Sequence, residues 1–69
     1  MITLELTLNG SLRSFEGPLS VAALIACLGA PRDAVAVEVD RKVIPRTEHA
    51  EHMLCGGERV EIVTLVGGG

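Results

Sequence analysis

The chain has 69 residues, which suffices for one small domain and leaves no room for separate cofactor and substrate domains. Its apolar fraction of 48% and charged fraction of 22% are ordinary for a globular protein and argue against disorder. The net charge of −3 and the single aromatic residue, Phe15, argue against nucleic-acid binding, because a basic stripe and a stacking platform are both missing from the sequence.

No segment of the sequence indicates export or membrane insertion. The longest apolar run, residues 21–28, is shorter than the roughly 20 residues that cross a bilayer. The first residues lack a basic stretch followed by an apolar block. Cys27 and Cys55 form no CxxC motif, so we expect two reduced thiols, with Cys27 as a small core residue. These features predict a mature, complete cytoplasmic protein with no membrane partner.

The start of the chain predicts a β-hairpin. Apolar and polar residues alternate over residues 1–8, as in a strand that buries one face. Asn9 and Gly10 tolerate the positive φ angles of a type I′ turn. We expect the returning strand over residues 11–15, with Leu12 and Phe15 turned inward.

A short amphipathic helix is predicted after the hairpin. Ser20 is a candidate N-cap, and Leu19 and Leu24 have the spacing of a hydrophobic staple around it. Gly29 ends the helix, and Pro31 prevents its resumption. The apolar face has the spacing i, i+3, i+4 and i+7 and consists of Val21, Leu24, Ile25 and Leu28.

Two further strands are predicted next. Residues 34–39 are rich in β-branched side chains and predict a strand that ends in a turn at Asp40 and Arg41. A very short strand follows at Val43 and Ile44. Pro45 ends it, because proline lacks a backbone donor.

A helical turn and the last strand complete the expected elements. Thr47 is a candidate cap for a single turn over residues 48–53. The last strand is expected over residues 59–66, with Val60 and Ile62 facing inward.

This order of elements predicts an α+β protein. A mixed sheet with one helix packed on one face fits the ubiquitin-like β-grasp fold, in which the last strand lies centrally beside the first. We expect a single domain over residues 1–66, followed by a flexible glycine tail over residues 67–69.

The three C-terminal glycines are the most informative feature of the sequence. Glycine makes up about 7% of average proteins, so three in a row at one fixed place arise by chance on the order of a few times in ten thousand. Because they lack Cβ atoms, they can enter a narrow channel. The carboxylate of Gly69 is then a reactive group on a thin arm. The alternative is a solvated tail or a cloning remnant without function.

Two runs of residues, together with the terminal glycines, resemble a known family. Residues 39–46 read VDRKVIPR, and residues 54–63 read LCGGERVEIV. In these runs, and in its length and order of elements, the chain resembles the thiamine-pathway sulfur carriers, which are ubiquitin-like β-grasp proteins. It departs from their pattern at the Asp40–Arg41 turn, at His49 where tryptophan is common, at Gly56 in place of an acid, and at the additional Gly67.

The resemblance implies a carrier rather than an enzyme, with no catalytic residue and no cofactor of its own. An E1-like adenylyltransferase would use ATP and magnesium to adenylate the carboxylate of Gly69. A sulfur donor, either a cysteine desulfurase or a rhodanese-type protein, would help convert it to a covalent thiocarboxylate. Thiazole synthase would accept the sulfur for thiamine biosynthesis. The tail of Gly67, Gly68 and Gly69 would enter the partners' active sites, and the free carrier would be a monomer.

Docking to such partners needs a surface near the tail. If alternation holds, Val63 and Leu65 face away from Val60 and Ile62, and with Val66 they form a candidate docking surface. The alternative is a central strand buried on both faces, which also reads as a continuous apolar run.

The other candidate side chains have simpler interpretations. His49, His52 and Cys55 lie three residues apart, a spacing that suits zinc, but a fourth ligand is not evident. We therefore expect solvated histidines and no metal site. Arg46 and Arg59 are candidate contacts for acidic groups of a partner, although such arginines are more often solvated.

Three other functions stay open. The same carrier chemistry serves molybdopterin synthesis and cysteine or methionine synthesis, and the VIPR step of residues 43–46 favours thiamine. A ubiquitin-like protein modifier would be conjugated to lysines through Gly69. A plain interaction domain with an inert tail would function without its last two glycines.

Overall fold

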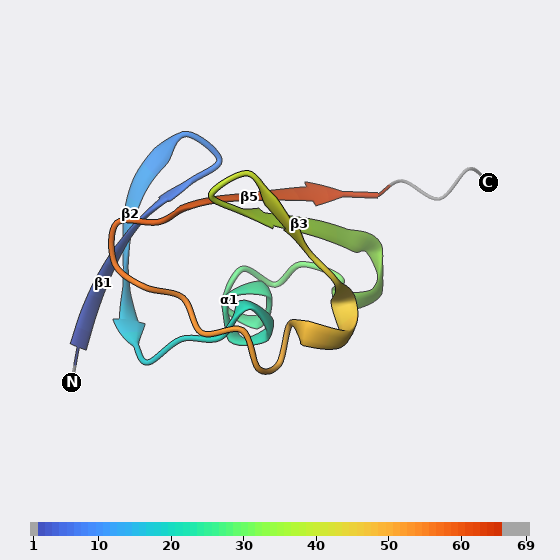
Figure 1. Ribbon diagram of the computed structural model, residues 1–69, viewed down its shortest axis with the longest axis horizontal. Helices are drawn as coiled ribbons and strands as arrows, with labels where there is room; N and C mark the ends of the chain where they lie inside the picture. The colour runs from blue at the N-terminus through green and yellow to red at the C-terminus, as the bar shows by residue number, and fades with distance from the viewer. Residues whose placement is uncertain (1, 66–69) are drawn as a thin grey trace.

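The computed structural model describes residues 2–65 as one mixed sheet with a helix on one side (Figure 1). The elements in chain order are β1 (Ile2–Leu8), β2 (Ser11–Gly17), α1 (Val21–Cys27), η1 (Arg32–Ala34), β3 (Val35–Val39), β4 (Lys42–Ile44), η2 (Arg46–Glu48) and β5 (Arg59–Thr64). The strands lie in the order β2-β1-β5-β3-β4. β1 and β5 are parallel, and all other neighbours are antiparallel. The predicted α+β class and the central last strand are confirmed.

Two-residue turns with positive φ angles close both hairpins of the sheet. Asn9 and Gly10 have φ angles of 47° and 83°, which confirms the predicted turn. Asp40 and Arg41 have φ angles of 49° and 71° in the second turn. The Asp40 N–H donates to the Arg59 carbonyl at 2.8 Å, and the Arg59 N–H donates to the Asp40 carboxylate at 2.9 Å. These two bonds hold the second turn against β5.

The N-terminus of α1 is capped by a side chain and by a distant segment of the chain. The Ser20 hydroxyl accepts a bond from the Ala23 N–H at 3.0 Å, so the predicted N-cap is confirmed. The Val21 and Ala22 N–H groups donate to the carbonyls of His52 and His49, each at 2.9 Å. These bonds fix the segment after η2 against the helix. Within residues 2–65, no helix is long and apolar enough to span a membrane.

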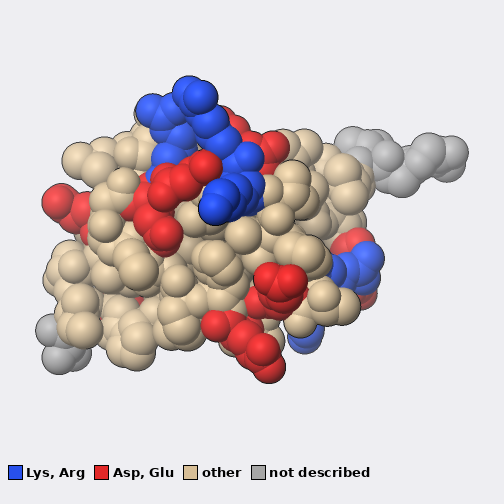
Figure 2. Space-filling model, viewed as in Figure 1, with Lys and Arg blue, Asp and Glu red and all other residues tan. Residues whose placement is uncertain are grey.

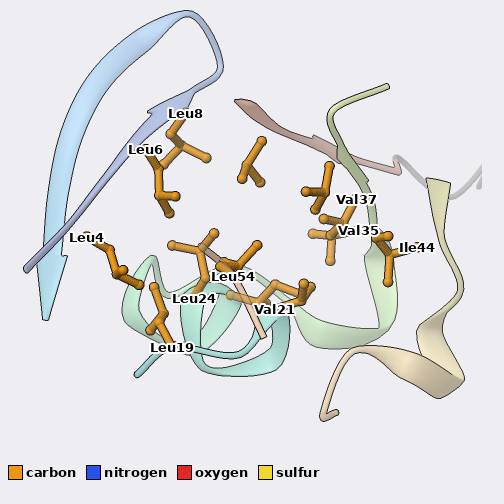
Figure 3. Close-up of a cluster of buried hydrophobic side chains, with 13 residues drawn as sticks. Leu4, Leu6, Leu8, Leu19, Val21, Leu24, Val35, Val37, Ile44 and Leu54 are labelled. Carbon is orange, nitrogen blue, oxygen red and sulfur yellow. The ribbon is translucent and has the colours of Figure 1, made fainter. Parts of the chain in front are cut away.

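The hydrophobic core lies between α1 and the face of the sheet that the helix covers (Figure 3). Alternate residues of the strands point into it, as the period of two predicts. Phe15, Leu28 and Ile62 are half-buried against its margin. The buried residues are Leu4, Leu6, Leu8, Leu19, Val21, Leu24, Ile25, Val35, Val37, Val39, Ile44, Leu54 and Val60.

Two residues predicted to face the core are exposed instead. Leu12 is 69% exposed, because the two-residue turn pairs it with Thr7 on the outer face of the sheet. Phe15 pairs with Leu4 and does turn inward. Cys27 is exposed because it lies roughly 110° of helical rotation from the centre of the buried face of α1.

The helical turn in the second half also differs from the prediction. It begins at Arg46, so Thr47 lies inside η2 and does not cap it. Pro45 occupies the N-cap position and offers no side-chain bond. Its φ angle of −59° lies in the range that the proline ring fixes.

Candidate functional site

β5 carries two of the predicted docking residues to the end of the described chain. Val60 is fully buried and Ile62 is half-buried, whereas Val63 and Leu65 are 58% and 54% exposed. The side chains of β5 therefore alternate between core and solvent. The alternative of a last strand buried on both faces is wrong.

Hydrogen bonds hold this segment from both sides. Pairing with β3 continues to Leu65, whose N–H donates to the Ala34 carbonyl. On the other side β1 pairs only with Arg59 and Val60. Beyond that point the side chain of Asn9 continues the ladder: the Ile62 N–H donates to its Oδ1 at 2.8 Å, and its Nδ2 donates to the Ile62 carbonyl at 3.2 Å.

Asn9 thus has a second role that the sequence analysis missed. Its backbone forms the turn of the first hairpin, and its side chain fixes β5 at the point where the strand leaves the pairing with β1. A side-chain amide offers the same donor and acceptor pair as a peptide group, so it can stand in for one more residue of a neighbouring strand. No local sequence signal reports this contact, which spans 53 positions.

An exposed apolar surface lies on the outer face of the sheet, near the end of β5. We define the outer apolar surface as Val43, Val63 and Leu65, which are 67%, 58% and 54% exposed. Val63 lies opposite Ala36 of β3, and Val43 of β4 lies on the same face of the sheet. In Figure 2 the charged side chains are sparse around the end of β5, and the largest group of Lys and Arg lies over the β3–β4 turn.

Charged residues border the outer apolar surface on the same face. Glu38 of β3 lies directly opposite Glu61 of β5. Like charges placed opposite each other in neighbouring strands are unfavourable. Arg59 is exposed, in agreement with the expectation of a solvated arginine.

The other predicted site residues lie elsewhere or outside the described range. Val66, Gly67, Gly68 and Gly69 fall outside residues 2–65, so the roles predicted for them stay predictions. Arg46 is exposed and pairs with Asp33 at 3.3 Å, on the side of the sheet that the helix covers.

His49 is not solvated as predicted. It is 6% exposed, and its Nε2 lies 2.8 Å from the carbonyl oxygen of Ile44. Its own carbonyl accepts the bond from Ala22, which draws the residue in against α1. His52 is half-buried and Cys55 is exposed. Among residues 2–65 no group of three His, Cys, Asp or Glu side chains is arranged to hold a metal ion.

Comparison with known proteins identifies the family. A family model described as the ThiS family matches residues 6–69, a range that includes the glycine tail. The chain belongs to the ThiS family. The resemblance to the thiamine-pathway sulfur carriers, predicted from the sequence, is thereby confirmed.

Two solved structures share the fold of this ThiS-family protein. The crystal structure of the thiamine biosynthesis protein ThiS from Geobacter metallireducens gives a TM-score of 0.82 at 30% identity, covering 96% of this chain and 100% of that one. A solution NMR structure of a thiamine biosynthesis protein from the same organism gives a TM-score of 0.78 at 30% identity, covering 96% and 88%. The predicted β-grasp fold is confirmed.

A further similarity is to part of a longer protein. The thiazole synthase of Paramagnetospirillum magneticum (strain ATCC 700264 / AMB-1) is 35% identical over 66 residues, which cover 96% of this chain. They cover 20% of that protein, so the chain spans about a fifth of the length of this relative.

Proposed function

We propose that this ThiS-family protein carries sulfur as a thiocarboxylate on Gly69 and delivers it to thiazole synthase. The observation that carries the proposal is the family match over residues 6–69, which extends through the glycine tail. β5 precedes that tail in the chain. It is hydrogen-bonded by β3 on one side as far as Leu65 and by Asn9 on the other side at Ile62. A rigid strand followed by residues without side chains suits the delivery of a carboxylate into another protein's active site.

The chemistry requires activation, because a carboxylate is a poor electrophile. An E1-like adenylyltransferase would join a Gly69 carboxylate oxygen to the α-phosphorus of ATP and release pyrophosphate, with magnesium bound by that enzyme. The terminal sulfur of a persulfide on the donor, a cysteine desulfurase or a rhodanese-type protein, would attack the carbonyl carbon and expel AMP. A thiol would then reduce the new sulfur–sulfur bond, ending as a disulfide and leaving the thiocarboxylate on Gly69.

The outer apolar surface supports docking by these partners. Val63 and Leu65 are exposed in the segment that precedes the tail, and Val66 follows Leu65 in the sequence. Apolar side chains that stay exposed near a functional terminus often mark an interaction site. We assign this surface to both the adenylyltransferase and thiazole synthase, which would therefore bind in turn rather than together.

Thiazole synthase is proposed as the acceptor because a protein of that name contains a segment similar to nearly all of this chain. A carrier domain and its acceptor are expected to work together when they occur in one polypeptide. We propose that the present protein acts in the cytoplasm, where ATP is available, as a free monomer and not as an enzyme. Gly67, Gly68 and Gly69 would enter the partners' active sites.

Intact mass measurement tests the proposal. The protein is incubated with ATP, magnesium, a sulfur donor and the adenylyltransferase of the same organism. We expect a mass gain equal to exchanging one oxygen for sulfur, mapped to the C-terminal peptide and absent after deletion of Gly69. Addition of thiazole synthase and its substrates should reverse the gain as the thiazole forms.

Two results would contradict different parts of the proposal. The absence of any gain, with an adenylyltransferase that hydrolyses ATP in the presence of the carrier, would overturn the sulfur-carrier role. A thiocarboxylate that forms and is not consumed by thiazole synthase would retain that role and overturn the acceptor. Mass is the appropriate readout, because the sequence contains no Trp or Tyr for absorbance or fluorescence.

A further inference from the structure

A small pocket lies on the side of the sheet that the helix covers, opposite the outer apolar surface. Its volume is about 50 Å³, and it opens between α1, η1 and the segment that begins at η2. Two alanines and an isoleucine form its apolar walls, and two arginines and a histidine supply its polar groups. The lining residues are Ala22, Ile25, Arg32, Arg46, His49 and Ala50.

His49 lines this pocket, and only one of its ring nitrogens has a hydrogen-bond partner within residues 2–65. A carbonyl oxygen only accepts hydrogen bonds, so the 2.8 Å contact between Nε2 and the Ile44 carbonyl places a proton on Nε2. No hydrogen bond within residues 2–65 uses Nδ1, and every fully buried side-chain nitrogen or oxygen there has a partner. Nδ1 therefore keeps contact with solvent. The residue is 6% exposed, and it lines the pocket.

The charged side chains that line the pocket are both positive. Arg32 and Arg46 both line the pocket, and no carboxylate does. One nitrogen of Arg46, Nη1, lies 3.3 Å from the Asp33 carboxylate. Both side chains of that pair are exposed. The other N–H groups of the planar Arg46 guanidinium have a fixed geometry that suits an oxyanion. Asp33 competes with any anion for this arginine.

We propose that this pocket binds a single phosphate-type oxyanion, held by Arg32, Arg46 and Nδ1 of His49. The pocket volume of about 50 Å³ exceeds the roughly 10–15 Å³ that a single water requires, so the pocket is larger than a one-water site. Hydrogenphosphate carries both donor and acceptor oxygens, so it can bond Nδ1 in either protonation form of the ring. The site shares no residue with the outer apolar surface, and the inference goes beyond the proposed sulfur transfer.

A second pair of arginines provides a matched comparison. Asp40, Arg41, Gly57 and Arg59 line a wider and more open hollow of about 320 Å³ beside the β3–β4 turn. A carboxylate is part of that lining, and no buried polar side chain is. We therefore assign oxyanion binding to the pocket at His49 and use Arg41 as the control position.

Nuclear magnetic resonance with inorganic phosphate tests the proposal. The protein is labelled with ¹⁵N, and phosphate is added at constant pH and ionic strength, with sodium chloride as the reference salt. We expect saturable shifts of the His49 ring nitrogens and of the Ala50 and Arg32 amides. Arg46→Ala should weaken binding about tenfold, the loss expected for one hydrogen bond to a charged group. Arg41→Ala should leave it unchanged.

Asp33→Asn gives the most discriminating result. It removes the competing carboxylate and keeps the shape of the side chain, so phosphate should bind more tightly than to the unmodified protein. A parallel titration with AMP distinguishes the source of the oxyanion. AMP shifts at the same residues with equal or greater affinity indicate a nucleotide phosphate, and binding of phosphate alone indicates the free ion.

Other outcomes would overturn the proposal. Linear shifts that do not saturate, shifts that sodium chloride reproduces, or binding that Arg41→Ala abolishes and Arg46→Ala spares would each exclude this pocket. If phosphate bound equally well to Asp33→Asn, to Arg46→Ala and to the unmodified protein, this pocket would also be excluded. Both substitutions are at exposed side chains, so the amide spectrum of each variant should show an intact fold.

Discussion

Both faces of the sheet carry large apolar side chains, and the faces differ in what covers them. On the inner face Leu6, Val37 and Val60 are fully buried beneath α1. On the outer face Leu12, Val43, Val63 and Leu65 are more than half exposed, although they alternate with the inner residues in the same strands. The inner residues stabilise the isolated chain, because their burial removes apolar surface from water. The outer residues gain nothing comparable until a partner covers them.

The largest predicted effect concerns the inner face. Leu24→Ala removes a fully buried side chain of α1 and should lower the free energy of unfolding by about 2–5 kcal/mol, since a cavity remains. Urea unfolding followed by far-ultraviolet circular dichroism measures the change. Leu12→Ala on the outer face is the matched control and should change stability by at most about 0.5 kcal/mol. Equal effects of the two substitutions would remove the distinction between the faces.

The next effect concerns the link between the first hairpin and β5. Asn9→Ala removes both side-chain bonds to Ile62 and places alanine at a φ of 47°, so stability should fall by about 1–3 kcal/mol. Asn9→Asp keeps the acceptor for the Ile62 N–H and loses the donor, so its loss should be smaller. Amide hydrogen exchange at Ile62 should accelerate most in the alanine variant. Unchanged exchange there would show that Asn9 contributes only to the turn.

A smaller effect is expected at the start of α1. Ser20→Ala removes the hydroxyl that accepts the Ala23 N–H and should cost about 1 kcal/mol. Ser20→Asp restores an acceptor at the same position and should recover most of the loss. The same urea titration measures both variants. If Ser20→Ala left the free energy of unfolding unchanged, the bonds to the carbonyls of His49 and His52 would suffice to hold this end of the helix.

Local signals predicted much of the fold. Asn9 with Gly10 gave a turn, Ser20 gave an N-cap, and the alternation of residues 1–8 gave a strand with one buried face. Each of these depends on residues close together in the chain. Leu12 was misplaced because its face depends on the register across the turn and not on its own strand pattern.

The candidate site was predicted less completely. Val63 and Leu65 lie in an apolar run, which fits a strand buried on one face or on both. Only the structure shows that the helix covers one face and leaves these two residues exposed. The burial of His49 and the bonds of Asn9 to Ile62 join segments distant in sequence, so no spacing rule reports them. The pocket at His49 combines three such segments and was not predicted at all.

The central claim is that the outer apolar surface serves a partner while the inner face serves stability. It is tested most directly by measuring thiocarboxylate formation and unfolding of Leu65→Glu, with Leu12→Glu as the control on the same face. Both positions are exposed, so both variants should keep the unfolding free energy within about 0.5 kcal/mol. Leu65→Glu should slow formation at least about tenfold, because a charge would be buried against the adenylyltransferase, and Leu12→Glu should not. Equal rates for Leu65→Glu and the unmodified protein would contradict the account.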